Sequence, residues 1–270
     1  MVDDSLEHIR TLGDGAPWQP IPAATRDTLS AESLPREPQG DVAAYEQFRE
    51  HVLPYTNGNR HPRFWGWIQG NGTPLGMMAD MLAAGMNAHL AGLDQSPKLV
   101  ELKVIEWLAE LMGFPKDSSG VLMSGGTMAN LVGLAVARHA KAGFDLRTEG
   151  LHGGPPLTVY ASNEVHSWAQ KSVELFGMGS ASLRKVPVDA SLRMDVAQLE
   201  AMIATDRAAG ARPICVIGTA GTVNSGAIDD LNAVADLCAR EQLWFHVDGA
   251  FGALAAFSPK LKPLVAGMER

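Results

Sequence analysis

The sequence predicts an α/β protein built around a mainly parallel sheet. Nearly half of its 270 residues are apolar (46%), which is enough for a large core. From about residue 120 onward, short apolar runs alternate with longer amphipathic segments. A helix-length segment between consecutive runs is the spacing of parallel strands joined by crossover helices.

The first ninety residues predict an arm followed by two helices. Prolines are frequent in residues 1–40, which favours an extended arm lying on another surface; they are Pro17, Pro20, Pro22, Pro35 and Pro38. Amphipathic patterns predict helices over 41–52 and 74–90. The aromatic loop HPRFWGWIQGNGTP separates them. We expect the arm and these helices to dock on a second subunit.

The segment from Ser96 onward carries the clearest helix signals. Ser96 is a good N-cap, Pro97 suits the first helical position, and apolar residues recur at helical spacing until Gly113. Beyond it we predict strands in the runs GVLMSG, PLTVYAS, SLRKVPV, PICVIGTA and LWFHVDGA. The predicted helices are TMANLVGLAVARHAKAG, HSWAQKSVELFG, DVAQLEAMIATDRAAG and DDLNAVADLCAREQL.

Charge and composition exclude several classes of partner. The net charge of −8 is spread out with no Lys/Arg block, so neither a nucleic-acid surface nor a polybasic membrane patch is expected. No apolar stretch approaches the ~20 residues that cross a bilayer, and the start lacks the features of a signal peptide. We expect a cytoplasmic protein with a small-molecule partner. Cys215 and Cys238 are expected to be reduced core residues.

The turn Ser124-Gly125-Gly126-Thr127 is a candidate phosphate site. It follows an apolar run and opens a helix expected to begin at Met128, so unpaired N–H groups and the positive helix end favour an anion. The turn matches neither the dinucleotide pattern G-x-G-x-x-G nor the P-loop, which argues against NAD and ATP. The alternative is an ordinary tight connection.

His166 is the second candidate. It follows a predicted strand where a helix begins, at the sheet edge where ligands collect, so its imidazole is placed to lie flat on a planar ring. The alternative is a helix-capping or surface histidine.

Asp248, in His246-Val247-Asp248-Gly249-Ala250, is the third candidate. A carboxylate at the end of an apolar strand needs a cationic partner, and no nearby Lys or Arg is an obvious one. A protonated pyridine nitrogen would serve, and the small Gly249 and Ala250 leave room for a flat ring. His246 and Asp248 are also metal-ligand types, but no further cluster completes a coordination set. The nucleophile elbow G-x-S-x-G of hydrolases is absent.

These motifs together resemble the group II pyridoxal-phosphate-dependent decarboxylases, the family of aromatic-L-amino-acid, histidine and glutamate decarboxylases. The resemblance extends from about His61 onward; its motifs are HPRFWGW, SPKLVELKVIEWLAELMGFP, SGGTMANLVGLAVAR, VYASNEVHSWAQKS, GTAGTVNSGAIDD and HVDGAFGA. It implies the fold-type I (aspartate aminotransferase-like) large domain, a three-layer α/β/α structure, in an obligate homodimer. We therefore expect residues 1–60 to form a dimer-forming arm and helix, and 61–270 the domain that binds pyridoxal 5'-phosphate.

Site residues follow from the resemblance position by position. Gly125, Gly126 and Thr127 match the phosphate loop. His166 matches the histidine stacked on the cofactor ring. Asp248 matches the aspartate that pairs with the pyridine nitrogen and keeps it protonated, which lets the ring spread the negative charge left by loss of carbon dioxide.

The other site positions depart from the family pattern or concern the substrate. Ala250 matches the small residue against the opposite ring face. Thr222-Val223 replaces a Thr-Thr pair, so a hydroxyl near the cofactor is either missing or supplied by Thr219. Gly70 stands where relatives often place a polar residue near the substrate carboxylate. Trp65 and Trp67 are candidates to face an aromatic substrate, although aromatic residues in such loops more often pack in cores or subunit contacts.

The imine-forming lysine of the family is the main departure. In relatives it follows a histidine on the strand after the aspartate, beyond Arg270; Lys260 and Lys262 precede that point and are expected to be solvated. The resemblance implies that at least two strands and the small C-terminal domain are absent from these residues. We expect a second polypeptide to supply the lysine. The alternatives are another fold-type I activity, an aminotransferase or cysteine desulfurase, or a lysine-free non-catalytic subunit.

Overall fold

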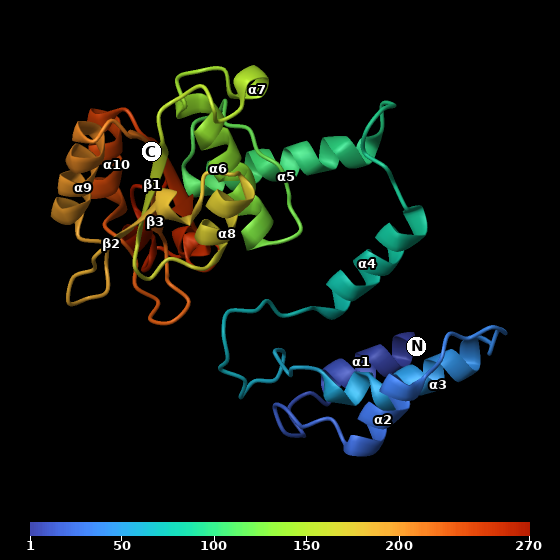
Figure 1. Ribbon diagram of the computed structural model, residues 1–270. Coiled ribbons are helices and arrows are strands. Elements are labelled where there is room, and N and C mark those ends of the chain that lie inside the picture. The colour runs from blue at the N-terminus through green and yellow to red at the C-terminus, as the bar shows by residue number, and fades with distance from the viewer. The chain divides into compact units, whose positions relative to one another are not determined.

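The computed structural model describes all 270 residues and divides them into two units, Met1–His89 and Leu90–Arg270. The second unit contains a four-stranded sheet and helices (Figure 1). Its strands are β1 (Leu157–Ser162), β2 (Leu183–Val186), β3 (Arg212–Thr219) and β4 (Trp244–Asp248). Its helices are α5 (Ser96–Met112), α6 (Gly126–Lys141), α7 (Leu146–Glu149), α8 (Trp168–Leu175), α9 (Val196–Ala208) and α10 (Leu231–Glu241), with short 3-10 turns η2 (Ser180–Ser182), η3 (Ala253–Phe257) and η4 (Lys262–Val265).

The sheet is parallel throughout, in the order β2-β1-β3-β4. This confirms the predicted class, and four of the five predicted strands are present. The fifth, over residues 120–125, is wrong: the structure has no strand there. No strand of the sheet pairs with this segment, and Val121 is 55% exposed, so neither hydrogen bonding nor burial holds it in a ladder.

Helices cover both faces of the sheet, giving three layers (Figure 1). On one face α6 and α8 pack against odd-numbered residues of β1 such as Val159 and Ala161. On the other, α9 and α10 pack against Tyr160 and Val216. Side chains alternate across a strand, so this division follows from the period of two. Cys215 and Cys238 are buried and free, as predicted.

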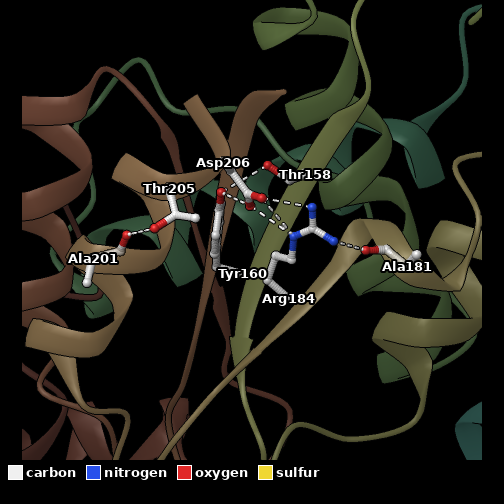
Figure 2. A network of polar contacts seen from close by, with 7 residues as sticks. All are labelled: Thr158, Tyr160, Ala181, Arg184, Ala201, Thr205 and Asp206. Atoms are coloured by element: carbon white, nitrogen blue, oxygen red, sulfur yellow. Dashed lines mark hydrogen bonds and ion pairs between the residues drawn. The ribbon is translucent and has the colours of Figure 1, made fainter. Parts of the chain in front are cut away.

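A buried polar network joins β1, β2 and α9. Figure 2 shows the carboxylate of Asp206 between the hydroxyl of Tyr160 and the guanidinium of Arg184. The Tyr160 hydroxyl donates to Asp206 Oδ2 at 2.6 Å, and Arg184 Nη2 lies 2.8 Å from Asp206 Oδ1. Thr158 Oγ1 lies 3.0 Å from the same tyrosine hydroxyl. The Arg184 hydrogen bonds lower the pKa of Asp206 despite its burial, so the network holds an ionised carboxylate against the sheet.

The first unit is helical. It contains α1 (Val2–Arg10), α2 (Ala23–Ala31), α3 (Asp41–His51), the 3-10 turn η1 (Leu53–Tyr55) and α4 (Pro74–Met86). Helices α3 and α4 match the predicted pair. The extended arm is wrong for α1 and α2, which are nine-residue helices: α1 ends before the first proline, Pro17, and α2 lies between Pro22, its N-cap, and Pro35.

Helix α5 has the predicted ends within one residue. Gln95 is the N-cap, the helix begins at Ser96, and Pro97 lies in its first turn. Gly113 ends it in a left-handed conformation with φ of 84°, which glycine adopts without steric cost. No helix in the structure has both the length and the apolar character needed to cross a lipid bilayer.

Candidate active site

The candidate site lies where the carboxyl ends of β1, β3 and β4 meet the start of α6. Ser162, Thr219 and Asp248 are the last residues of these three strands, and Thr219 pairs with Asp248 in the sheet register. In parallel α/β folds, ligands bind at this edge because the strand ends and helix N-termini converge there.

The glycine turn forms the start of α6. Gly125 is the N-cap and the helix begins at Gly126, two residues earlier than predicted, with no side chain capping its N–H groups. A Cβ placed on Gly126 would lie 3.1 Å from the Cβ of Ala250. The helix start and the segment after β4 therefore approach closely because both residues are small. The uncapped N–H groups and the helix dipole suit an anion.

Asp248 is held by three neutral donors. It is 6% exposed. Its Oδ2 accepts from Trp168 Nε1 at 2.6 Å, and its Oδ1 accepts from Asn130 Nδ2 and from the Ala250 N–H, each at 3.2 Å. No ion pair in the structure involves Asp248. A buried carboxylate supported only by neutral groups is suited to a cationic ligand.

Asn130 connects Asp248 to His246. Its amide nitrogen donates to Asp248 Oδ1 and to the Gly126 carbonyl, at 3.2 and 2.9 Å. The amide oxygen must then accept from His246 Nε2, which lies 2.7 Å away. This fixes the imidazole as the tautomer protonated at Nε2. A Cβ on Gly133 would come within 2.6 Å of the imidazole Cε1, so the histidine ring needs glycine at this point of α6.

Burial lowers the pKa of His246 from 6.5 to about 4, against the opposing effect of Asp248. Between pH 4 and pH 6.5, His246 is mostly protonated in the unfolded chain and mostly neutral in the folded one. Because the unfolded chain binds more protons there, the contribution of His246 to stability falls as the pH decreases from 6.5 toward 4. We expect His246→Gln to remove this part of the pH dependence, which is up to about 1.4 kcal/mol per pH unit. Urea unfolding between pH 4 and pH 7 measures it.

The matched control is His139→Gln, at an exposed position of α6, the helix whose Asn130 contacts His246. It should retain the slope of the unchanged chain. Equal slopes for all three proteins would contradict a neutral, buried His246.

Trp168 connects Asp248 to His166. Its indole donates to Asp248, while its backbone N–H donates to His166 Nδ1 at 3.2 Å. Its ring meets that of His246 edge-on, with centroids 5.6 Å apart. His166 itself is exposed at the start of α8.

Two hydroxyls at the strand ends have no hydrogen-bond partner although they are buried, those of Ser162 and Thr219. The backbone N–H of Thr219 donates to the buried carboxylate of Asp229 at 2.8 Å, which fixes the end of β3. By contrast, the Thr222 hydroxyl lies 2.7 Å from Ser225 Oγ and is already engaged. Thr219 is therefore the threonine with an uncommitted hydroxyl at this edge.

The structure thus brings Gly126, Ala250 and Asp248 together, and links His166 to them through Trp168. Gly125 and Thr127 flank Gly126 at the helix start, and Thr219 pairs with Asp248. Trp65, Trp67 and Gly70 belong to the first unit, and their role toward a substrate remains a prediction. Trp65 is 92% exposed.

Sequence reasoning missed Asn130 and Trp168. Both lay within the quoted motifs, and both carried a signal: Asn130 follows Gly126 by one helical turn, and Trp168 follows His166 by two residues. No group of three or more His, Cys, Asp or Glu residues is arranged to hold a metal ion. The His246 Nε2 atom is committed to Asn130.

Fold and site together define a parallel α/β protein with an anion site and a buried carboxylate at one sheet edge. The family model of the pyridoxal-dependent decarboxylase conserved domain matches residues 22–270. The chain belongs to this family, and its fold is that of the fold-type I enzymes, as the motifs predicted. Pyridoxal phosphate is the cofactor of the family.

Individual relatives belong to the same class of decarboxylases. The aromatic-L-amino-acid decarboxylase of Bacillus atrophaeus is 33% identical over 273 residues, covering 100% of this chain and 55% of the relative. The cysteine sulfinic acid decarboxylase of Mus musculus is 32% identical over 242 residues, covering 88% of this chain and 49% of the relative. The crystal structure of Oryza sativa TDC with PLP and tryptamine has a TM-score of 0.88 at 26% identity, covering 100% of this chain and 57% of that one. The chain thus spans about half the length of its relatives.

The residues present fit pyridoxal 5'-phosphate. The uncapped start of α6 can hold its phosphate, and the unpaired carboxylate of Asp248 can hold its protonated pyridine nitrogen. The partnerless hydroxyl of Thr219 lies beside Asp248 in the sheet register and is a further polar group for the same ligand.

Proposed function

We propose that this chain is the cofactor-binding part of a pyridoxal-phosphate-dependent decarboxylase of L-amino acids. The observation that carries the proposal is Asp248, a buried carboxylate with three neutral donors and no cationic partner, next to the helix start that suits a phosphate. Family membership supports the reaction class.

Each group has a physical task. Asp248 keeps a proton on the pyridine nitrogen; the bound cofactor then supplies an electron sink for the charge left when carbon dioxide departs. The N–H groups of Gly126 and Thr127 hold the phosphate. His166 restricts the tilt of the ring and so sets which bond of the substrate lies perpendicular to it. Thr219 offers a hydroxyl for orientation.

The lysine that binds the cofactor covalently is proposed to lie outside these residues, on a complementary C-terminal polypeptide. Three observations support this. The lysines after Asp248, Lys260 and Lys262, are both exposed, and the matched relatives are about twice as long. Apolar side chains that such a segment would cover are exposed in the second unit, including Val121, Leu122 and Leu99. The completed subunit is proposed to form a cytoplasmic homodimer, with the N-terminal residues taking part in the contact.

An aromatic amino acid is the proposed substrate. The relatives include decarboxylases named for aromatic amino acids and for cysteine sulfinic acid, so their names do not decide between substrates. The exposed rings of Trp65 and Trp67 favour the aromatic class.

The test begins with the chain purified together with any bound polypeptide, examined by native mass spectrometry. Absorbance then detects bound pyridoxal 5'-phosphate, and borohydride reduction followed by peptide mapping locates any pyridoxyl-lysine. A panel of aromatic and acidic amino acids is assayed for carbon dioxide and for keto acid.

Release of carbon dioxide with a pyridoxyl-lysine on a second polypeptide is the expected result. Keto acid as the main product would assign the chain to the aminotransferases instead. A folded monomer of this chain alone would contradict the two-polypeptide arrangement, and cofactor bound with no pyridoxyl-lysine anywhere would indicate a non-catalytic subunit.

A further inference from the structure

We propose that Trp168 is a positioning residue that sets the ionisation and orientation of Asp248, and that Asn130, oriented by His246, completes the same support. This inference rests on the proposed function, in which Asp248 holds the cofactor nitrogen. It assigns a role to an indole that the reaction itself does not require.

The contact between Trp168 and Asp248 is short and enclosed. The distance from Nε1 to Oδ2 is 2.6 Å, below the usual range for an N–H donor even to a charged oxygen, and Trp168 is 1% exposed. An indole N–H donates only and cannot accept. It therefore favours the ionised carboxylate, because it cannot accept a hydrogen bond from the O–H of a protonated one.

Asn130 likewise favours the ionised form of Asp248, by donating to its other oxygen, Oδ1. Its amide nitrogen faces Oδ1 of Asp248 because its amide oxygen is committed to His246 Nε2. A neutral His246 that donates from Nε2 prevents the amide from flipping, so both Asp248 oxygens face donors of fixed polarity. This arrangement favours the anion that a pyridinium needs.

Trp168 also relates Asp248 to His166. One residue donates from its side chain to the carboxylate and from its backbone to the imidazole at position 166. Asp248, predicted to bind the ring nitrogen, and His166, predicted to stack on the ring face, are thereby both held by one buried residue. Their spacing is set by the dimensions of one tryptophan.

The titratable groups around Asp248 come from three elements. His246 precedes it on β4 and is linked through Asn130; His166 lies before α8 and is linked through Trp168; Asp229 binds the backbone of Thr219, the register partner of Asp248 on β3. None of them contacts the carboxylate directly, so its direct hydrogen-bond partners remain the three neutral donors.

The first experiment follows the indole ¹⁵N–¹H resonances of the unmodified chain, which has six tryptophans. One resonance, absent in Trp168→Phe, is expected to lie downfield and to move both on acidification and on addition of pyridoxal 5'-phosphate. Asp248→Asn should move it as well. The resonance of Trp107, on α5, is the control and should not respond. A Trp168 resonance insensitive to pH and to Asp248→Asn would overturn the inference.

The second experiment measures pyridoxal 5'-phosphate binding against pH. Phenylalanine keeps the ring but loses the donor to Oδ2, so the ionised carboxylate is less favoured, and affinity should begin to fall at a higher pH than in the unmodified chain. A shift of one pH unit in the midpoint of binding corresponds to about a tenfold loss of affinity in the pH range between the two midpoints. Trp107→Phe should change neither affinity nor midpoint.

The outcomes separate the two proposals. If the chain purified together with its bound polypeptide does not bind the cofactor, the proposed function fails, while the resonance still reports the contact with Asp248. If the cofactor binds equally to Trp168→Phe with an unchanged midpoint, the positioning role fails and the proposed function stands. Far-ultraviolet circular dichroism establishes that the variant is folded.

Discussion

Replacing Asp248 with asparagine is expected to weaken pyridoxal 5'-phosphate binding by about a hundredfold or more. The carboxamide is neutral, so it cannot stabilise a pyridinium, and removal of one partner of a buried ion pair costs about 3–5 kcal/mol. Its amide nitrogen would also face either the indole of Trp168 or the amide of Asn130, donor against donor. Titration followed by absorbance gives the affinity.

Asp117→Asn makes the same chemical change at an exposed position and serves as the control. Its affinity should match that of the unmodified chain. If Asp248→Asn also bound the cofactor with unchanged affinity, the assignment of Asp248 to the pyridine nitrogen would be wrong.

Replacing Asp206 with alanine is expected to lower the free energy of unfolding by about 2–3 kcal/mol. The change removes the acceptor of the Tyr160 hydroxyl, which is fully buried, and leaves the partly buried guanidinium of Arg184 without its ion-pair partner. Urea denaturation of the chain measures the loss. Because hydrogen bonds lower the pKa of Asp206, its contribution is present above the ordinary aspartate pKa and is lost as the pH falls through the lowered value.

Two further variants calibrate this result. Tyr160→Phe removes the hydroxyl's hydrogen bonds to Asp206 and Thr158 but leaves the Arg184 ion pair, and should cost about 1–2 kcal/mol. Glu200→Gln breaks an exposed pair with Arg240 and should cost less than about 1 kcal/mol. Similar small losses for all three would show that the network adds nothing beyond surface pairs.

The sheet was predictable because its strands are short apolar runs bounded by turn residues, and because helices of sufficient length separate them. Asp248 was predictable for a related reason: a carboxylate directly after an apolar strand is conspicuous, and its side chain falls on the same face as His246 two residues earlier. The glycine turn was identified by its position before a long helix. Local pattern was sufficient in each of these cases.

The remaining features depend on contacts that local pattern does not contain. Residues 120–125 have the composition of a strand but no neighbour to pair with, and pairing is what makes a strand. The prolines of residues 1–40 indicated an extended arm, yet α1 forms before the first of them and α2 fits in the interval between Pro22 and Pro35. Asn130 and Trp168 approach Asp248 from 118 and 80 residues away in sequence, a distance that only the folded sheet closes.

The three donors to Asp248 come from three separate segments, namely α6, α8 and the turn that follows β4. Moving the carboxylate would require all three to shift at once. The entropy cost of fixing the Asp248 side chain is therefore incurred during folding and not on ligand binding. A cationic ligand then binds a carboxylate that is already oriented. Such a site favours a ligand that is itself flat and rigid over one that must adapt.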